Sequence, residues 1–239
     1  HMELGGGGVY SIFNPAILRD VDLYTGGFGA EYGDRLSAVL DIETRDGAYN
    51  RLRGSTALSM AYAEGVIEGQ LPAAKGQGSF LFSARRSYFD LLIKLTEYRK
   101  AFKVFPNYYD LAGKLSYRLS PNHKLSLTGL WASDNAIVKL REEESDVVGD
   151  VDWYTDKALL ALGLQSSLGE NLVSQLVLSA SRGEHRHHIG DLWHDEGART
   201  VLAVREDIIW DILPRHRLKA GLVFDRRLQT VSMRMPDPA

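Results

Sequence analysis

The residues best suited to chemistry in this chain gather in one histidine-rich stretch. Residues 184–188 read Glu-His-Arg-His-His, and the stretch continues with Asp191, His194, Asp195 and Glu196. Imidazole and carboxylate groups are common ligands of transition metals, and alternation along an extended chain puts His185 and His187 on one side. The HExxH spacing of a helical zinc site does not occur. A charged loop explains the same composition, so His185, His187 and His188 are weak metal candidates, and we expect no bound metal.

Signatures of other chemistry are missing from the sequence. The chain has no Cys, which removes thiol catalysis, thiolate metal sites and disulfides. No GxSxG, P-loop or dinucleotide fingerprint occurs. The formal charge of −3 and the pI near 6.2 argue against a general nucleic-acid binder. We therefore expect a protein that is not an enzyme, needs no cofactor and has no nucleic-acid partner.

Long alternating strands are the elements that must position these residues. In 111–119, for example, Leu111, Gly113, Leu115, Tyr117 and Leu119 occupy one face, while Lys114, Ser116 and Arg118 occupy the other. No apolar run approaches the ~20 residues of a membrane-spanning helix, and the mean hydropathy is −0.20. The pattern predicts nine strands, at 53–62, 65–72, 78–88, 107–119, 123–133, 153–168, 171–183, 200–212 and 216–230.

The connections between these strands differ in length. Short joints made of turn-forming residues are predicted at 71–76, 120–123, 168–171 and 213–216, and long joints at 89–106, 134–152 and 184–199. The first hairpin is expected to turn near Ala63 and Glu64. Short turns at one end and long loops at the other are typical of outer-membrane β-barrels. A soluble sandwich also alternates, but its strands average only ~5–6 residues.

Aromatic residues near the strand ends are consistent with the two interfacial girdles of such a barrel. The candidates are Tyr88, Tyr108, Tyr109, Tyr117, Trp131, Trp153, Tyr154 and Trp210.

The first fifty residues have a different, glycine-rich texture. A short helix is predicted at 14–18, where Asn14 can cap the helix and Pro15 suits its first position. Strands are predicted at 20–24 and 38–44. Gly26-Gly27 and Gly33 are expected to take positive φ at reversals of the chain, and Phe28 and Tyr32 supply apolar mass for a compact lobe.

The order of motifs in 13–47 carries a specific resemblance. Val21-Asp22-Leu23-Tyr24-Thr25-Gly26-Gly27 is followed by Ala30-Glu31-Tyr32-Gly33 and then by Ser37-Ala38-Val39-Leu40-Asp41-Ile42-Glu43-Thr44-Arg45-Asp46-Gly47. This stretch resembles the end of the plug domain of TonB-dependent outer-membrane receptors, and its turn motif consists of Gly26, Gly27, Phe28, Ala30, Tyr32 and Gly33. Residues 83–92 and 108–111 look like early barrel strands of the same family.

The resemblance implies a domain organisation. Residues 9–50 form the C-terminal part of an α+β plug and 51–239 the N-terminal part of a transmembrane β-barrel, after a tag remnant and flexible lead at 1–8. In the family the plug sits inside a barrel of 22 strands, so the chain resembles an incomplete portion of a receptor. Polar contacts between plug and wall are expected from Arg35, Asp41 and Arg45. Further candidates are Glu31 and Glu43 on the plug, and Lys114, Arg118, Lys157, Arg205 and Asp207 on the wall.

The resemblance also implies a function in the outer membrane of a Gram-negative-type bacterium. Such receptors take up a scarce, bulky nutrient, such as a metal chelate, vitamin, glycan or peptide, by energised movement of the plug. The partners would be the TonB complex, through a segment upstream of this sequence, outer-membrane lipid and an extracellular nutrient. The alternative class is a non-transporting β-protein, either a small adhesin-like barrel or a soluble ligand-binding sandwich. We expect self-association through open strand edges if the chain is isolated.

Overall fold

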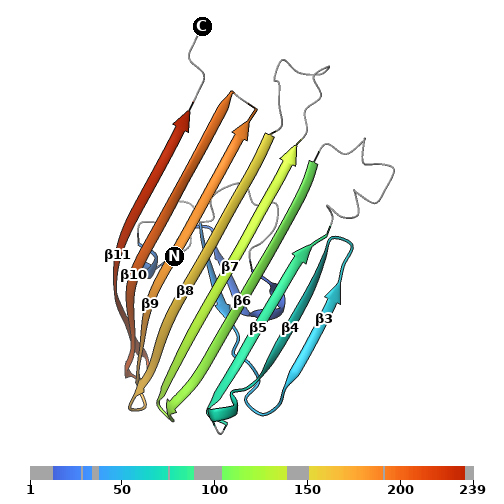
Figure 1. The fold of residues 1–239 in the computed structure, drawn as a ribbon. Coiled ribbons are helices and arrows are strands. Elements are labelled where there is room, and N and C mark those ends of the chain that lie inside the picture. The colour runs from blue at the N-terminus through green and yellow to red at the C-terminus, as the bar shows by residue number, and fades with distance from the viewer. Residues whose placement is uncertain are drawn as a thin grey trace.

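A nine-stranded antiparallel sheet dominates the fold, and its strands follow one another in sequence order from β3 to β11 (Figure 1). The structure is a computed structural model that describes residues 13–27, 29–33, 38–74, 76–88, 104–138, 151–190 and 192–234. The prediction of a mainly β, antiparallel fold with nine strands after Arg51 is confirmed. The predictions for Phe28, Arg35 and the lead at 1–8 lie outside the described residues.

The later strands of the sheet are longer than predicted. The nine strands are β3 (Arg53–Leu58), β4 (Tyr62–Gln70), β5 (Gly78–Ser87), β6 (Val104–Ser120), β7 (His123–Val138), β8 (Val151–Leu168), β9 (Leu172–Ile189), β10 (Trp193–Leu213) and β11 (His216–Arg234). A short 3-10 turn, η3 (Pro72–Ala74), joins β4 to β5. The 18 residues of β8 extend over about 60 Å at ~3.3 Å per residue. The sheet therefore reaches well beyond the ~30 Å hydrocarbon thickness of a bilayer.

Two predictions for the connections are wrong. The first hairpin turns at Ser59–Ala61, and Ala63 and Glu64 belong to β4, where they pair with Arg86 and Arg85. Residues 184–199 do not form a long joint, because β9 continues to Ile189 and β10 begins at Trp193. The polar residues of this segment stay in strand conformation because β9 and β10 pair with each other there, and this pairing outweighs their low intrinsic preference for strands.

A small N-terminal lobe (residues 13–49 as described) lies against one face of this sheet, behind the strands as Figure 1 views them. The lobe contains η1 (Pro15–Ile17), β1 (Leu18–Tyr24), η2 (Ala30–Tyr32) and β2 (Val39–Thr44), and β1 pairs with β2 in an antiparallel hairpin. The predicted cap is confirmed, because the Asn14 side chain accepts a hydrogen bond from the Ala16 amide at 2.9 Å. We call the sheet face that carries the lobe the inner face and the opposite one the outer face.

The core lies where the lobe meets the inner face. Ile17 of η1 packs with Val66 of β4 and Leu81 of β5, which are 3%, 7% and 1% exposed. Leu18 and Ala112 cover the edge of this cluster. Because Leu81 alternates with Phe80 and Phe82, burying one side of β5 under the lobe leaves the other side on the outer face.

The outer face is apolar over the middle of the strands. Its exposed members include Ile67, Phe82, Leu111, Leu127, Trp131, Leu160, Leu162, Leu178, Leu202 and Val204. Tyr109 and Tyr117 lie on this face of β6, and the eight residue steps between them span about 26 Å, which matches the ~25 Å apolar band of outer-membrane barrels. Among the described residues, no helix is long and apolar enough to cross a membrane.

The aromatic residues divide between the two faces. On the outer face, Tyr109 and Tyr154 lie toward one end of the strands, next to the more central Trp131, and Tyr117 and Trp210 lie near the other end. The expectation that Tyr108 and Trp153 join these girdles is wrong. Strand parity turns both inward, where Tyr108 is 4% exposed beside Arg85 and Trp153 contacts His187.

Strands β3 and β11 form the two edges of the sheet, and in the described part of the chain each has one neighbour. All residues of β3 are exposed, as are all but one of those in β11. Unpaired ladder edges of this length are normally covered by further strands or by association.

Leu81→Ala is expected to lower the free energy of unfolding by about 2–4 kcal/mol, because it leaves a cavity between the lobe and the nine-stranded sheet, which we call the wall. Urea unfolding of the full-length gene product in detergent measures this loss. The matched control is Leu160→Ala on the outer face, where the side chain is 55% exposed. Equal losses in the two variants would contradict the packing described.

Candidate functional site

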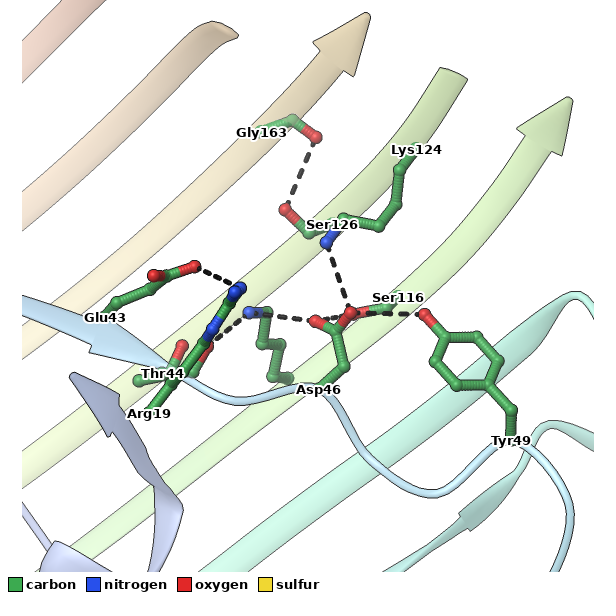
Figure 2. Close-up of polar contacts among 10 residues, drawn as sticks. Arg19, Glu43, Thr44, Asp46, Tyr49, Ser116, Lys124, Ser126 and Gly163 are labelled. Carbon is green, nitrogen blue, oxygen red and sulfur yellow. Dashed lines mark hydrogen bonds and ion pairs between the residues drawn. The ribbon is translucent and has the colours of Figure 1, made fainter. Parts of the chain in front are cut away.

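Asp46 is the centre of the polar contacts that attach the lobe to the wall (Figure 2). Its Oδ1 lies 3.0 Å from Lys114 Nζ and accepts a hydrogen bond from Ser116 Oγ at 2.8 Å. Its Oδ2 lies 3.2 Å from Lys124 Nζ and accepts a hydrogen bond from Tyr49 at 3.3 Å. One carboxylate thus joins the chain after β2 to both β6 and β7.

The surroundings of Asp46 stabilise its charged form. Burial alone would raise the pKa of this carboxyl group, but the hydrogen bond and charge of Lys114 outweigh burial, helped by Ser116 and by the charge of Lys124. The pKa of Asp46 therefore lies well below its usual range. The carboxylate is therefore ionised at neutral pH, where both lysines carry a positive charge.

Flanking residues extend the attachment on both sides of Asp46. Lys114 Nζ also donates to the Thr44 carbonyl at 2.7 Å. Arg45 Nη1 lies 2.5 Å from Glu68 Oε2 on β4, while Arg45 Nε donates to the Ala16 carbonyl at 3.0 Å. Arg45 therefore connects η1 to the wall. Near the end of β6, Arg118 covers the ring of Tyr49 at 4.1 Å from its centroid.

Gly47 brings the backbone of the lobe against the backbone of β5. A Cβ atom at Gly47 would lie 1.9 Å from the carbonyl oxygen of Phe80 and 2.5 Å from its carbonyl carbon. No side chain fits in that space, so glycine is required by close approach and not by a positive φ. Asp46 and Gly47 are the last two residues of the motif in 13–47, but the sequence alone does not indicate their contacts with the sheet, because Phe80 and Ser116 lie 33 and 70 residues further along the chain.

The residues of the predicted turn motif lie at the opposite end of the lobe. Gly27 has the expected positive φ of 64°, but Gly26 does not have a positive φ and Gly33 has φ −52°, so the expectation is wrong at these two positions. The short helix η2 begins at Ala30 and ends at Tyr32. The ring of Tyr32 contacts the ring of Tyr24, and its hydroxyl group donates a hydrogen bond to Asp41 at 2.8 Å. Burial and the neighbouring Asp41 carboxylate raise the pKa of Tyr32.

Of the predicted plug–wall residues, the structure places Arg45 against the wall and Asp41 within the lobe, on Tyr32. Gly26 lies in an open turn, where an added Cβ would meet nothing within 4 Å. Glu31 lies 3.8 Å from Lys219 of β11, a wall residue that the sequence did not indicate. Glu43 pairs with Arg19 inside the β1–β2 hairpin at 3.0 Å.

The predicted histidine cluster lies on paired strands and not in a loop. On the inner face, His185 Nε2 and His187 Nδ1 lie 3.6 and 3.7 Å from Asp195 Oδ2. His188 is on the outer face, 3.2 Å from Glu196. Strand alternation separates His188 from the other two. The described residues contain no group of three or more ligands placed to hold a metal ion.

A second buried ion pair, not predicted from the sequence, braces the inner face. Arg85 Nε lies 2.6 Å from Asp110 Oδ2, and the two side chains are 6% and 2% exposed. The guanidinium also lies over the rings of Tyr62 and Tyr108, at 5.5 and 5.1 Å. These contacts tie β4, β5 and β6 together on the inner face, so its polar residues serve cohesion as well as contact with the lobe.

Between the lobe and the wall the contacts enclose a small cavity of about 270 Å³. Its lining is mixed, with polar residues such as Thr44, Lys124 and Gln175 beside apolar ones such as Ile17 and Leu81. The arrangement attaches a small hairpin to the inner face of the sheet through charged groups and one close backbone contact. These contacts attach the lobe to the sheet.

The fold of the chain is similar to part of the fold of FpvA, a TonB-dependent receptor. FpvA of P. aeruginosa, solved with a heterologous pyoverdine and iron, superimposes with a TM-score of 0.70 at 12% identity over 92% of this chain. FpvAI in complex with pyocin S2 gives a TM-score of 0.70 at 11% identity over 91%. This chain spans about a third of each neighbour, 33% and 34% of their lengths. No protein-family model and no curated protein matches it.

Gly47→Ala is expected to detach the segment around Asp46 from β5, because the new methyl group collides with the Phe80 carbonyl. We expect a loss of about 1–3 kcal/mol in unfolding free energy and faster tryptic cleavage at Arg45 and Arg51 in the folded protein. Gly26→Ala, in an open turn, is the control. Unchanged cleavage in Gly47→Ala would contradict the close approach.

Asp46→Asn is expected to cost about 1–3 kcal/mol at pH 7, between the values for exposed and fully buried ion pairs, because Lys114 and Lys124 lose their counter-ion. The folded-state pKa is lowered, so this contribution is fully present above the unfolded value near 3.8 and is lost as the pH falls below it. Urea unfolding of wild type and variant from pH 7 to pH 3 measures the difference.

The control for this measurement is Asp22→Asn on exposed β1, which should change stability by less than about 0.5 kcal/mol. A difference between wild type and Asp46→Asn that stays constant down to pH 3 would show that the carboxylate charge is not what holds the segment.

Proposed function

We propose that this chain is part of a TonB-dependent outer-membrane receptor that takes up a scarce, bulky nutrient. The observation that carries the proposal is the pairing of an apolar outer face with an inner face that holds a separate lobe through Asp46. A lipid-exposed wall around an attached plug needs both features. Residues 9–50 would be the C-terminal part of the plug and 51–239 the first part of the barrel.

The likeness to FpvA supports this proposal at the level of the fold. FpvA was solved with ferric pyoverdine and FpvAI with pyocin S2, so we place metal chelates first among the nutrient classes, ahead of vitamins, glycans and peptides. Energy would come from the TonB complex acting on a segment upstream of the residues in this sequence. The short turns at 121–122, 169–171 and 214–215 would then face the periplasm.

The alternatives fit less well. A soluble sandwich would cover the outer leucines with a second sheet, yet Leu111 and Leu160 are 51% and 55% exposed on the single large sheet. A small adhesin-like barrel would fill its interior with its own side chains and would leave the attached lobe without a role.

The orientation of the wall can be tested with brominated lipids, which quench tryptophans that face acyl chains. In vesicles of the full-length gene product, Trp131→Phe on the outer face should remove a strongly quenched component of the emission. Trp153→Phe on the inner face is the matched control and should remove an unquenched component. If neither component is quenched, the outer face of the sheet does not contact acyl chains, and the proposed membrane location is contradicted.

The uptake itself is tested in a strain from which the gene is deleted. We expect the deletion strain to accumulate less of a radiolabelled ferric chelate than the parent strain. The wild-type gene should restore accumulation when TonB is present but not in a strain that lacks TonB. Normal accumulation of chelates, vitamins, glycans and peptides in the deletion strain would contradict the transport function while leaving the membrane orientation untouched.

A further inference from the structure

The outer face is hollowed where β3 to β8 run side by side. A hollow of about 1010 Å³ lies over Gly54, Gly65, Gly113 and Gly129, with Phe82 and Leu160 among its walls. Its size is at the top of the range of small-ligand sites, roughly 300–1,000 Å³. Nearly all of its lining is apolar, which fits hydrocarbon and not a polar ligand.

Missing side chains, and not a bend of the backbone alone, create the hollow. A Cβ added at Gly65 would meet nothing within 4 Å, and one at Gly129 would meet only Leu160 Cδ1 at 3.9 Å. At Gly113, by contrast, the ring of Phe82 already covers the backbone at 2.8 Å from the added atom. Apolar atoms that line an unfilled space lose dispersion contacts unless another molecule fills it.

The hollow continues toward the end of the strands that carries the long connections. A second space of about 530 Å³ shares Gly65, Ala84, Leu111 and Trp131 with the first and reaches Arg86. The Tyr109 ring stacks on Trp131 with centroids 6.4 Å apart and planes 11° apart. Aromatic side chains of this kind mark the level of lipid headgroups.

Arg86 supplies a cation at this level. Its guanidinium lies 5.6 Å from the centroid of the Tyr109 ring, and within the described residues no carboxylate forms an ion pair with it. The adjacent Arg85 points to the inner face and is occupied by Asp110. An exposed guanidinium on an aromatic platform, directly above an apolar hollow, matches an anion attached to hydrocarbon, and Arg suits phosphate by its planar fork of donors.

We infer that this groove binds a phosphorylated, multiply acylated glycolipid of the lipid A kind, with a phosphate on Arg86 and acyl chains in the hollow. The assignment to the outer leaflet rests on the proposed function, which puts the end of β5 on the extracellular side. The groove spans six neighbouring strands, about 24 Å at ~4.8 Å per strand. That width suits several chains side by side better than the two of a glycerophospholipid.

The test measures lipid A that remains bound to the full-length gene product during purification, by native mass spectrometry. We expect retention by the wild type and about tenfold weaker retention by Arg86→Gln, the usual loss for one charge-assisted contact. Arg226→Gln, on the outer face of β11 outside the groove, is the matched control and should retain lipid A.

A second pair of variants tests the hollow. An added Cβ at Gly65 meets nothing within 4 Å, so Gly65→Leu should extend into the hollow and displace lipid A, whereas Ala180→Leu on the outer face of β9 should not. Added phosphatidylglycerol should displace bound lipid A from the groove less effectively than added lipid A does. Equal competition would overturn the glycolipid assignment.

The inference is also overturned if the wild type retains no lipid A, or if Gly65→Leu and Arg86→Gln retain as much as their controls. The brominated-lipid measurement separates these failures from failure of the proposed function. If Trp131 is quenched but no lipid A is bound, the proposed membrane location stands and only the lipid A site is rejected.

Discussion

Strict alternation of side chains along the strands is the constraint on which the rest of the structure depends. Each strand sends successive residues to opposite faces, and the strands pair in sequence order, so one face becomes apolar throughout and the other polar. The burial of Leu81 under Ile17 and the exposure of Phe82 are two results of that rule. A slip of one residue in any strand would put leucines against the lobe and lysines on the outer face.

The attachment of the lobe uses the polar side of this rule. Lys114 and Ser116 on β6 and Lys124 on β7 all face inward within reach of Asp46, so one carboxylate can meet all three. Gly47 follows at once and lets the backbone lie against β5. Electrostatic attraction and close packing therefore act on adjacent residues, which fixes the end of the lobe although the β1–β2 hairpin above it is largely exposed.

The outer face has an equally specific use of the same alternation. Glycines at outward positions of four strands remove side chains from the apolar band, while Arg86 and Tyr109 close its upper end with a charge and aromatic rings. The same alternation separates the histidines, which are neighbours in the sequence. Residues 185–188 look like one cluster in the sequence, but parity sends His185 and His187 inward and His188 outward, where each finds a carboxylate of β10.

The sequence by itself determined the strand number, the antiparallel order, the two kinds of face and the cap at Asn14, because these depend on local periodicity and on residues a few positions apart. It misjudged the ends of β3, β9 and β10 and the φ of Gly33, since cross-strand pairing and neighbouring contacts override local preference there. Only the tertiary structure decided that Asp46 and Gly47 hold the lobe, because Ser116 and Lys124 lie 70 and 78 residues from Asp46 in sequence. Contacts over such separations depend on strand register and height, and a single sequence encodes these only through the completed fold.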